Sequence, residues 1–230
     1  MSASVLFRDA RWLALDKPAG VVTTPNVPGA PSLIDLARAV APDAGRLHPI
    51  NRLDLDVSGV VLFALDDRAI AAHESARAQG PQARGYVALV SPAPSIVSGA
   101  WDRPIGLHPS RRGLRAVNGR DAEPARTEYR VVEARGAVAW LALSPLTGRT
   151  HQLRVHCAAA GCPVLGDRDY GGARRCVTDD GAVHPVERVM LHAAWRQIPG
   201  SDWRVESPPP REMAALWATL GGLAGRDDLR

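Results

Sequence analysis

The chain has 230 residues, of which 46% are hydrophobic and 23% charged, and its formal net charge is +4. This balance is typical of a folded domain and excludes a chain that is disordered over its whole length. No apolar run approaches the ~18 residues that a membrane-spanning helix needs. Arg8, Asp9 and Arg11 stand where a secretory signal would be apolar. We therefore expect a cytoplasmic protein.

Short strands and helices alternate irregularly along the sequence. We expect strands over residues 4–8, 11–16, 59–65, 86–90, 127–132, 138–143 and 190–194. We expect helices after Ser32, over 66–78, over about 150–160, and after Pro210 to about Leu220. Residues 24–31 and 171–187 read as loops, and 106–126 as a mobile loop or an irregular hairpin. Because hairpins dominate, we predict an α+β fold with a mixed, mostly antiparallel central sheet and flanking helices.

Cysteine usage and motif content exclude several classes of site. Cys157, Cys162 and Cys176 cannot all pair, and none has CxxC spacing, so free thiols in a reducing compartment fit best. The histidines and cysteines match no zinc signature. Neither GxGxxG nor GxxxxGK[ST] is present. We expect no cofactor and no metal ion.

Arginine supplies almost all of the positive charge, because Lys17 is the single lysine beside 27 arginines. The planar guanidinium suits recognition of phosphates and bases. A bias in genomic base composition would produce the same preference. The region 106–126 is the densest in arginine and contains Arg111, Arg112, Arg115, Arg120 and Arg126.

One group of polar residues, Asn51 to Gly59, precedes the most apolar strand. Taken alone, Asp54 and Asp56 are typical of loop carboxylates that accept hydrogen bonds from backbone amides. The functional alternative is a nucleophile or base at the end of the sheet. Arg52 would then favour the ionised form of the carboxyl.

A second group, Thr147 to His156, reads as a turn that leads into a helix N-terminus, a natural anion site. We expect Arg149 and Thr150 in the first helical turn, with His151 and Arg154 on one face. The alternative is an ordinary capped, solvated helix. His192 lies in an apolar strand, where a hydrogen-bonded core histidine is the better default.

Six segments of the chain together resemble sequences of the RluA-type RNA pseudouridine synthases. RLDLDVSG resembles the signature around the catalytic aspartate of that family, and TGRTHQLRVH followed by CPVLGDRDYGG resembles the second signature. LFRDARWLALDKPAGVVTTP resembles the first strand pair, and RGYVALV the strand that carries the active-site tyrosine. PARTEYRV and MLHAAW resemble later core strands. The resemblance covers roughly residues 4–210.

The resemblance implies the pseudouridine synthase fold with a catalytic cleft. It implies a single catalytic domain over residues 4–220, no separate RNA-binding headpiece, and a C-terminal tail over 221–230. The implied activity is isomerisation of specific uridines to pseudouridine in an rRNA or tRNA stem-loop. The expected partner is RNA, without a membrane, and the expected oligomeric state is a monomer.

The resemblance also implies residue roles. Asp54 matches the nucleophile, Arg154 the arginine that pairs with it, and Tyr86 the aromatic residue that stacks on the uracil. Arg52 matches a side chain that is inserted into the RNA when the base is extruded. The other candidates for RNA contact are Arg149, Thr150, His151, Arg111, Arg112 and Arg115. Asn51 and Val57 depart from the histidine and threonine usual in the family, which bears on the substrate rather than the reaction.

Two alternatives stay open at this point. The first is a catalytically inactive RNA-binding protein on the same scaffold, which the presence of Asp54, Tyr86 and Arg154 disfavours. The second ignores the resemblance and is a hydrolase that uses Asp54 or Asp56 with His151. The absence of GxSxG and HExxH disfavours the hydrolase.

Overall fold

The computed structural model describes residues 3–25, 30–178 and 180–223. The chain divides into two compact units, one of residues 1–84 and 193–208 and the other of residues 85–192 and 209–230. Each unit is therefore built from two separate stretches of sequence. The fold is α+β with mostly antiparallel strands, as the sequence predicts, and four helices lie in the described ranges. One catalytic domain over residues 4–220 stays a prediction.

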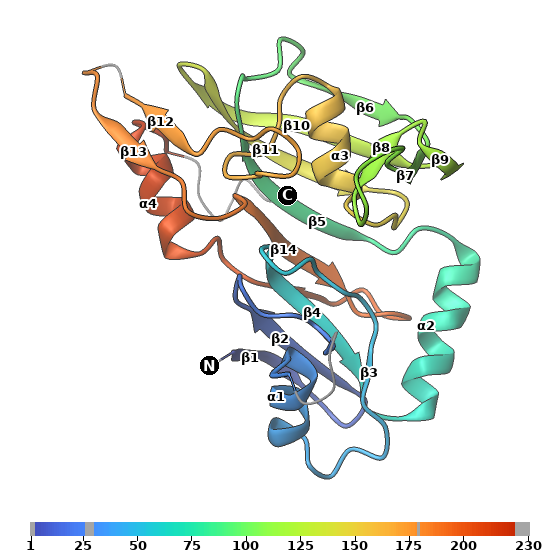
Figure 1. The fold of residues 1–230 in the computed structure, drawn as a ribbon. Coiled ribbons are helices and arrows are strands. Elements are labelled where there is room, and N and C mark those ends of the chain that lie inside the picture. Colours follow the sequence, from blue (N-terminus) through green and yellow to red (C-terminus); the bar gives the residue numbers. More distant parts are fainter. Residues whose placement is uncertain (1–2, 26–29, 179, 224–230) are drawn as a thin grey trace. The chain divides into compact units, whose positions relative to one another are not determined.

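The first unit has a sheet in the order β1-β2-β4-β14, with β15 paired to β14 and β3 paired to β4 (Figure 1). The predicted strands 4–8, 11–16 and 59–65 and the predicted helices after Ser32 and over 66–78 are confirmed. Its elements are β1 (Ser4–Arg8), β2 (Trp12–Lys17), α1 (Leu33–Val40), β3 (His48–Pro49), β4 (Ser58–Ala64), α2 (Asp67–Gln79), most of β14 (Leu191–Gln197), and β15 (Arg204–Glu206).

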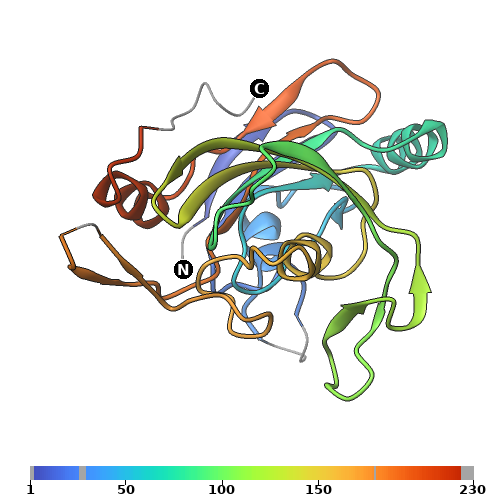
Figure 2. The ribbon, with the colours of Figure 1, turned by 90° about the horizontal axis from the view of Figure 1, so that it is seen from above.

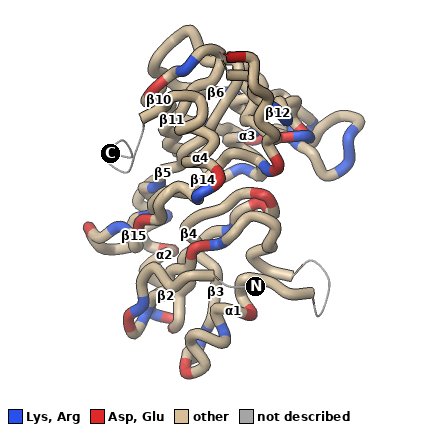
Figure 3. Tube along the Cα trace, turned by 90° about the vertical axis from the view of Figure 1, so that its left-hand side faces the viewer, with Lys and Arg blue, Asp and Glu red and all other residues tan. Residues whose placement is uncertain are grey.

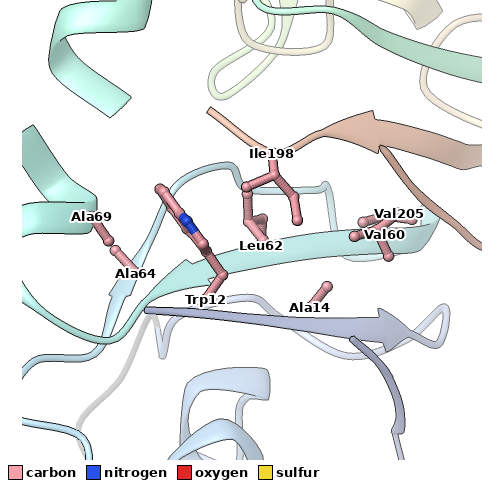
Figure 4. Close-up of a cluster of buried hydrophobic side chains, with 8 residues drawn as sticks. All are labelled: Trp12, Ala14, Val60, Leu62, Ala64, Ala69, Ile198 and Val205. Carbon is pink, nitrogen blue, oxygen red and sulfur yellow. The ribbon is translucent and has the colours of Figure 1, made fainter. Parts of the chain in front are cut away.

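The core of the first unit lies on both faces of β4, all seven residues of which are buried. Side chains alternate between the faces of a strand, so a strand covered on both sides is apolar throughout. On one face a cluster joins two strands, α2 and the segment around β15 (Figure 4). Its members are Trp12, Ala14, Val60, Leu62, Ala64, Ala69, Ile198 and Val205.

The second unit has a larger sheet in the order β5-β11-β10-β6, a small sheet in the order β8-β7-β9, and the hairpin β12–β13. The small sheet, light green in Figure 2, projects from the larger one. The elements are β5 (Arg84–Val90), β6 (Ser98–Asp102), β7 (Ile105–Leu107), β8 (Arg115–Val117), β9 (Arg120–Glu123), β10 (Arg126–Arg135), β11 (Val138–Pro145), α3 (Gln152–Ala159), β12 (Arg175–Val177), β13 (Val183–Pro185) and α4 (Arg211–Thr219).

Helices α3 and α4 pack on opposite faces of this larger sheet. His156 of α3 bonds Thr127 of β10, which lies opposite Pro145 of β11. Trp217 of α4 packs on Trp140, an even-numbered residue of β11, with ring centroids 5.8 Å apart. Because side chains alternate along β11, Trp140 and Pro145 point to opposite faces. Helices therefore cover both faces of the sheet at β11, most residues of which are buried.

Two sequence expectations are wrong here. Residues 171–187 contain the β12–β13 hairpin rather than loop alone; its three-residue strands are too short to show a clear alternation. Helix α3 begins at Gln152 rather than near Thr150, because His151 has a left-handed backbone with φ 57°. The basic region 106–126 forms much of the small sheet, so the irregular hairpin, rather than a mobile loop, is the interpretation that fits.

Other expectations concern the cysteines and the chain's ends. All three cysteines are free and buried. None of the helices in the described ranges is long and apolar enough to cross a membrane. Residues 26–29 of the predicted loop 24–31, and residues 224–230 of the predicted C-terminal tail, lie outside the described residues.

Replacing Gly59 with Ala should destabilise the protein. Gly59 has φ +116°, and a Cβ there would lie 2.2 Å from the backbone oxygen of Ala193. Overpacking against backbone and a strained φ together should cost about 2–4 kcal/mol of unfolding free energy, measured by urea denaturation. Gly20→Ala is the matched control, because φ is +80° but nothing lies within 4 Å. Equal losses in the two variants would show that the close approach to Ala193 is unimportant.

Candidate active site

Asp54 lies in the first unit, on the loop between β3 and β4. Its side chain is half-buried, while Arg52 and Asp56 are exposed and Leu53 is buried. The hydroxyl of Thr23 accepts a hydrogen bond from the Leu53 amide at 3.2 Å and donates one to the Leu53 carbonyl at 3.3 Å. The residue that precedes Asp54 is therefore held through both of its backbone polar groups.

Lys17, at the end of β2, holds the residue on the other side of Asp54. Its side chain is fully buried. Its ammonium donates to the carbonyls of Val21 (2.6 Å), Pro18 (3.0 Å) and Leu55 (3.1 Å). The Gly20 amide donates to the same Leu55 carbonyl at 2.8 Å. A buried charge is costly unless it is hydrogen-bonded, and these carbonyls supply the bonds.

Asn51 acts as an extension of the sheet. Its side-chain oxygen accepts a hydrogen bond from the Leu62 amide at 3.0 Å, and its side-chain nitrogen donates to the Val60 carbonyl at 3.1 Å. These are the two kinds of bond that a neighbouring strand would make with β4. The departure from the family's histidine therefore has a structural role at this position.

Arg154, in the second unit, is held by two carboxylates. Its Nε and Nη2 donate to the two oxygens of Asp167 at 2.7 and 2.8 Å, and Nη2 also donates to Asp169 at 2.9 Å. The side chains of Arg154 and Asp167 are 7% and 0% exposed. Such a forked, desolvated pair fixes the plane of the guanidinium as well as its position.

A buried hydrogen-bond chain anchors α3 on β10. Gln152 donates to the hydroxyl of Thr127 at 3.0 Å, and that hydroxyl lies 2.9 Å from Nδ1 of His156. The other ring nitrogen lies 2.9 Å from the carbonyl of Arg103, so it carries the proton and Nδ1 accepts. Burial, more than any neighbouring charge, lowers the pKa of His156.

The same glutamine shapes the turn before α3. The oxygen of Gln152 accepts from the Thr147 hydroxyl at 2.7 Å and from the Arg149 amide at 3.0 Å. The expectation that Arg149 and Thr150 lie in the first helical turn is wrong, because both precede α3. His151 is the N-cap rather than a helical neighbour of Arg154. The Arg149 guanidinium pairs with Glu123 and donates to the Pro124 carbonyl at 3.0 Å.

The remaining candidates lie on strands and loops of the second unit. Tyr86 is a half-buried residue of β5 opposite Leu143 of β11. Arg111 and Arg112 are exposed in the loop between β7 and β8, and Arg115 is half-buried at the start of β8. Thr150 is exposed and His151 half-buried.

Four of the predicted site residues contact the same segment of the second unit, whereas the predicted catalytic residues belong to both units. Arg111, Arg115, His151 and Arg154 all contact the segment 167–170. Asp54 and Arg52 belong to the first unit and Tyr86 and Arg154 to the second, so the pairing of Asp54 with Arg154 stays a prediction. Segments of both charge signs are interspersed in each unit (Figure 3).

Several residues that support the site were missed. Lys17, Thr23, Asp167 and Gln152 reveal their partners only in three dimensions. The one available signal was that a chain with 27 arginines keeps one lysine. Within residues 3–25, 30–178 and 180–223, no three His, Cys, Asp or Glu side chains are grouped so that they could hold a metal ion.

Comparison with known proteins gives one consistent family. The profile described as RNA pseudouridylate synthase matches residues 11–159. The chain is 35% identical over 227 residues to the ribosomal large subunit pseudouridine synthase D of Nitrosomonas europaea, a match that covers 95% of this chain and 65% of that protein. It is 33% identical over 190 residues to the dual-specificity RNA pseudouridine synthase RluA of Salmonella typhimurium, which covers 82% of this chain and 83% of that one.

A solved structure agrees. Human RNA pseudouridylate synthase domain containing 4 matches with a TM-score of 0.78 at 25% identity, and the match covers 97% of this chain and 95% of that chain. The chain spans slightly less than two thirds of the length of the Nitrosomonas protein.

Replacing Lys17 with Met should loosen the Asp54 loop and destabilise the protein. Three carbonyls would lose their charged donor, which should cost about 3 kcal/mol or more of unfolding free energy. Lys17→Arg should be destabilising too, because a planar fork cannot replace three divergent donors. Urea denaturation measures the loss, and amide exchange at Gly20 and Val57 reports on the loop. Arg46→Met, which removes an exposed pair with Asp67, is the control. Wild-type stability in Lys17→Arg would contradict this account.

The stability of the protein should fall at acidic pH, and His156 should be one cause of this fall. Because its pKa in the folded protein is lowered from about 6.5, the unfolded chain binds a proton that the folded one does not. The contribution is complete above pH 6.5 and declines as the pH falls below it. Urea midpoints between pH 7.5 and 5 should fall more steeply for the wild type than for His156→Gln. Burial also lowers the pKa of His73, which acts equally in both proteins. Parallel profiles would exclude His156 as the cause.

Proposed function

The chain belongs to the RluA-type family of RNA pseudouridylate synthases, and we propose that it isomerises uridine to pseudouridine within RNA. The substrate is a structured rRNA or tRNA, and the ribosomal large subunit named for the Nitrosomonas relative is the first candidate. RNA loops that already expose unstacked bases are the usual targets of sequence-specific recognition.

Asp54 is held in a way that suits a nucleophile, and this carries the proposal. Thr23 fixes Leu53, and Lys17 with Gly20 fixes Leu55, so both neighbours of Asp54 are anchored through their backbone. The side chain between them is only half-buried. A reactive carboxylate needs this combination of a rigid support and an accessible oxygen.

The reaction moves uracil without any net oxidation. Asp54 attacks the sugar or the base, and the bond between the ribose C1′ and the uracil N1 breaks. The uracil turns, C1′ bonds to C5, the bond between the substrate and Asp54 breaks, the C5 proton leaves to solvent, and N1 takes up a proton. The family resemblance assigns Arg154 to pair with the nucleophile and Tyr86 to stack on the uracil. Substrate and product are isomers, so no cofactor or metal ion enters the balance.

RNA binding is assigned to Arg52 and to a group of polar residues in the second unit. Arg52 is exposed two residues before Asp54, where it can take the place of the extruded uridine; extrusion costs a few kcal/mol that such an insertion offsets. Arg111, Arg112, Arg115, Arg149, Thr150 and His151 contact the phosphate backbone. Affinity should therefore weaken with salt. The cytoplasmic location and the monomeric state that the sequence predicts stay predictions.

Asp54→Asn should abolish the isomerisation while RNA affinity is kept, because a neutral amide is a poor nucleophile. The assay is tritium release from rRNA and tRNA transcripts labelled at uridine C5, with affinity measured by filter binding. A fall in rate of at least about 10³-fold is expected for loss of a covalent catalyst.

Asp56→Asn is the matched control, since Asp56 is exposed in the same loop, and its rate should stay close to that of the wild type. Activity retained in Asp54→Asn but lost in Asp56→Asn would reverse the assignment. Wild-type affinity without any release would favour the inactive RNA-binding alternative.

A further inference from the structure

An arginine-bearing arm projects from the second unit. We use this name for residues 105–117, which are β7, β8 and the loop between them (Figure 2). The loop is closed tightly: Nδ1 of His108 accepts hydrogen bonds from the amides of Ser110 and Arg111 at 3.2 and 3.1 Å. The His108 amide donates to the Leu114 carbonyl at 3.1 Å. Arg111 and Arg112 are thus presented from an ordered, exposed turn.

The arm is bonded to the segment that follows α3. Arg111 donates from Nη1 to the Asp169 carbonyl at 2.9 Å, and the Arg115 amide donates to the hydroxyl of Tyr170 at 3.0 Å. Tyr170 also packs on a small apolar cluster that links the arm to α3. The cluster contains Ile105, Ala125 and Val155, and Val117 packs beside them. Any displacement of the arm would therefore disturb its contacts with Tyr170.

Tyr170 contacts Arg154 and His151 as well. The guanidinium carbon of Arg154 lies 4.9 Å from the centre of the Tyr170 ring, within the range of a cation–π contact. The Tyr170 hydroxyl lies 2.7 Å from Nδ1 of His151. Burial raises the pKa of Tyr170, so the neutral phenol donates to His151 while it accepts from Arg115.

The backbone at His151, the N-cap of α3, is strained. It adopts φ 57°, a left-handed conformation that is uncommon for a residue with a side chain and that persists where surrounding contacts enforce it. Its bond to Tyr170 is such a contact. One phenol therefore touches the arm, the strained N-cap of α3, and the guanidinium that Asp167 and Asp169 hold.

We propose that Tyr170 is a positioning residue that transmits RNA binding at the arm to Arg154. This inference rests on the proposed function. RNA phosphates that bind Arg111 and Arg112 fix the arm, the arm fixes the Tyr170 hydroxyl through the Arg115 amide, and the Tyr170 ring fixes the Arg154 guanidinium. The arm then contributes to turnover as well as to affinity.

Tyr170→Phe tests the coupling, because it removes the hydroxyl and keeps the ring over Arg154. Tritium release from C5-labelled rRNA and tRNA transcripts gives kcat and KM, and filter binding of the same transcripts gives Kd. We expect kcat to fall about tenfold, as for the loss of two hydrogen bonds, with Kd changed less than about twofold. Tyr129→Phe is the control, since Tyr129 stacks on Trp101 elsewhere in the unit; both constants should stay at wild-type values.

A double-mutant cycle with Arg112→Ala separates coupling from simple destabilisation. In the wild-type background this change should weaken Kd and lower kcat at saturating RNA. In the Tyr170→Phe background it should weaken Kd by the same factor and leave kcat unaltered. Additive effects on kcat, or an unchanged kcat in Tyr170→Phe, would overturn the inference. No release by the wild type would overturn the proposed function itself.

Discussion

The geometry of the Asp54 loop depends on one buried ammonium group. Lys17 binds the carbonyls of Pro18, Val21 and Leu55, and so ties the turn after β2 to the loop before β4. The chain otherwise uses arginine for positive charge. A guanidinium is planar and donates in its own plane, whereas an ammonium donates in three divergent directions. The one place where lysine is kept is a place where that difference matters.

In the second unit, a buried ion pair positions the Arg154 side chain. The Arg154–Asp167 pair is almost fully buried, and a hydrophobic replacement of such a pair is often no less stable. Its value is therefore better sought in orientation. Two parallel bonds to Asp167 leave the guanidinium no freedom to rotate, and Asp169 adds a third bond. In each unit the residue proposed for catalysis is positioned by buried polar contacts rather than by apolar packing alone.

Much of the fold was predictable because its signals are local. The apolar run of β4, the Asp66 cap of α2 and the β10–β11 hairpin around Gly136 can each be read from a few neighbouring residues. The start of α3 was not, because the left-handed conformation of His151 depends on contacts with Tyr170, 19 residues away. The same limit applies to the site. Motifs pointed to Asp54 and Arg154, but Thr23, 30 residues before Leu53, could be linked to the loop only through the fold.

The two residues that depart from the family's usual pattern lie at positions that support the Asp54 loop. Asn51 binds the backbone of β4, and Val57 is buried with 3% of its surface exposed. Both residues therefore lie in the hydrogen bonding and packing that support the Asp54 loop. Arg52, Arg111 and Arg112 are exposed cations, although the Arg111 side chain also donates to the Asp169 carbonyl. A surface charge can be exchanged at little cost in stability, whereas an anchor cannot. Differences in RNA choice between relatives should therefore be sought at these exposed positions and in the arm that carries two of them.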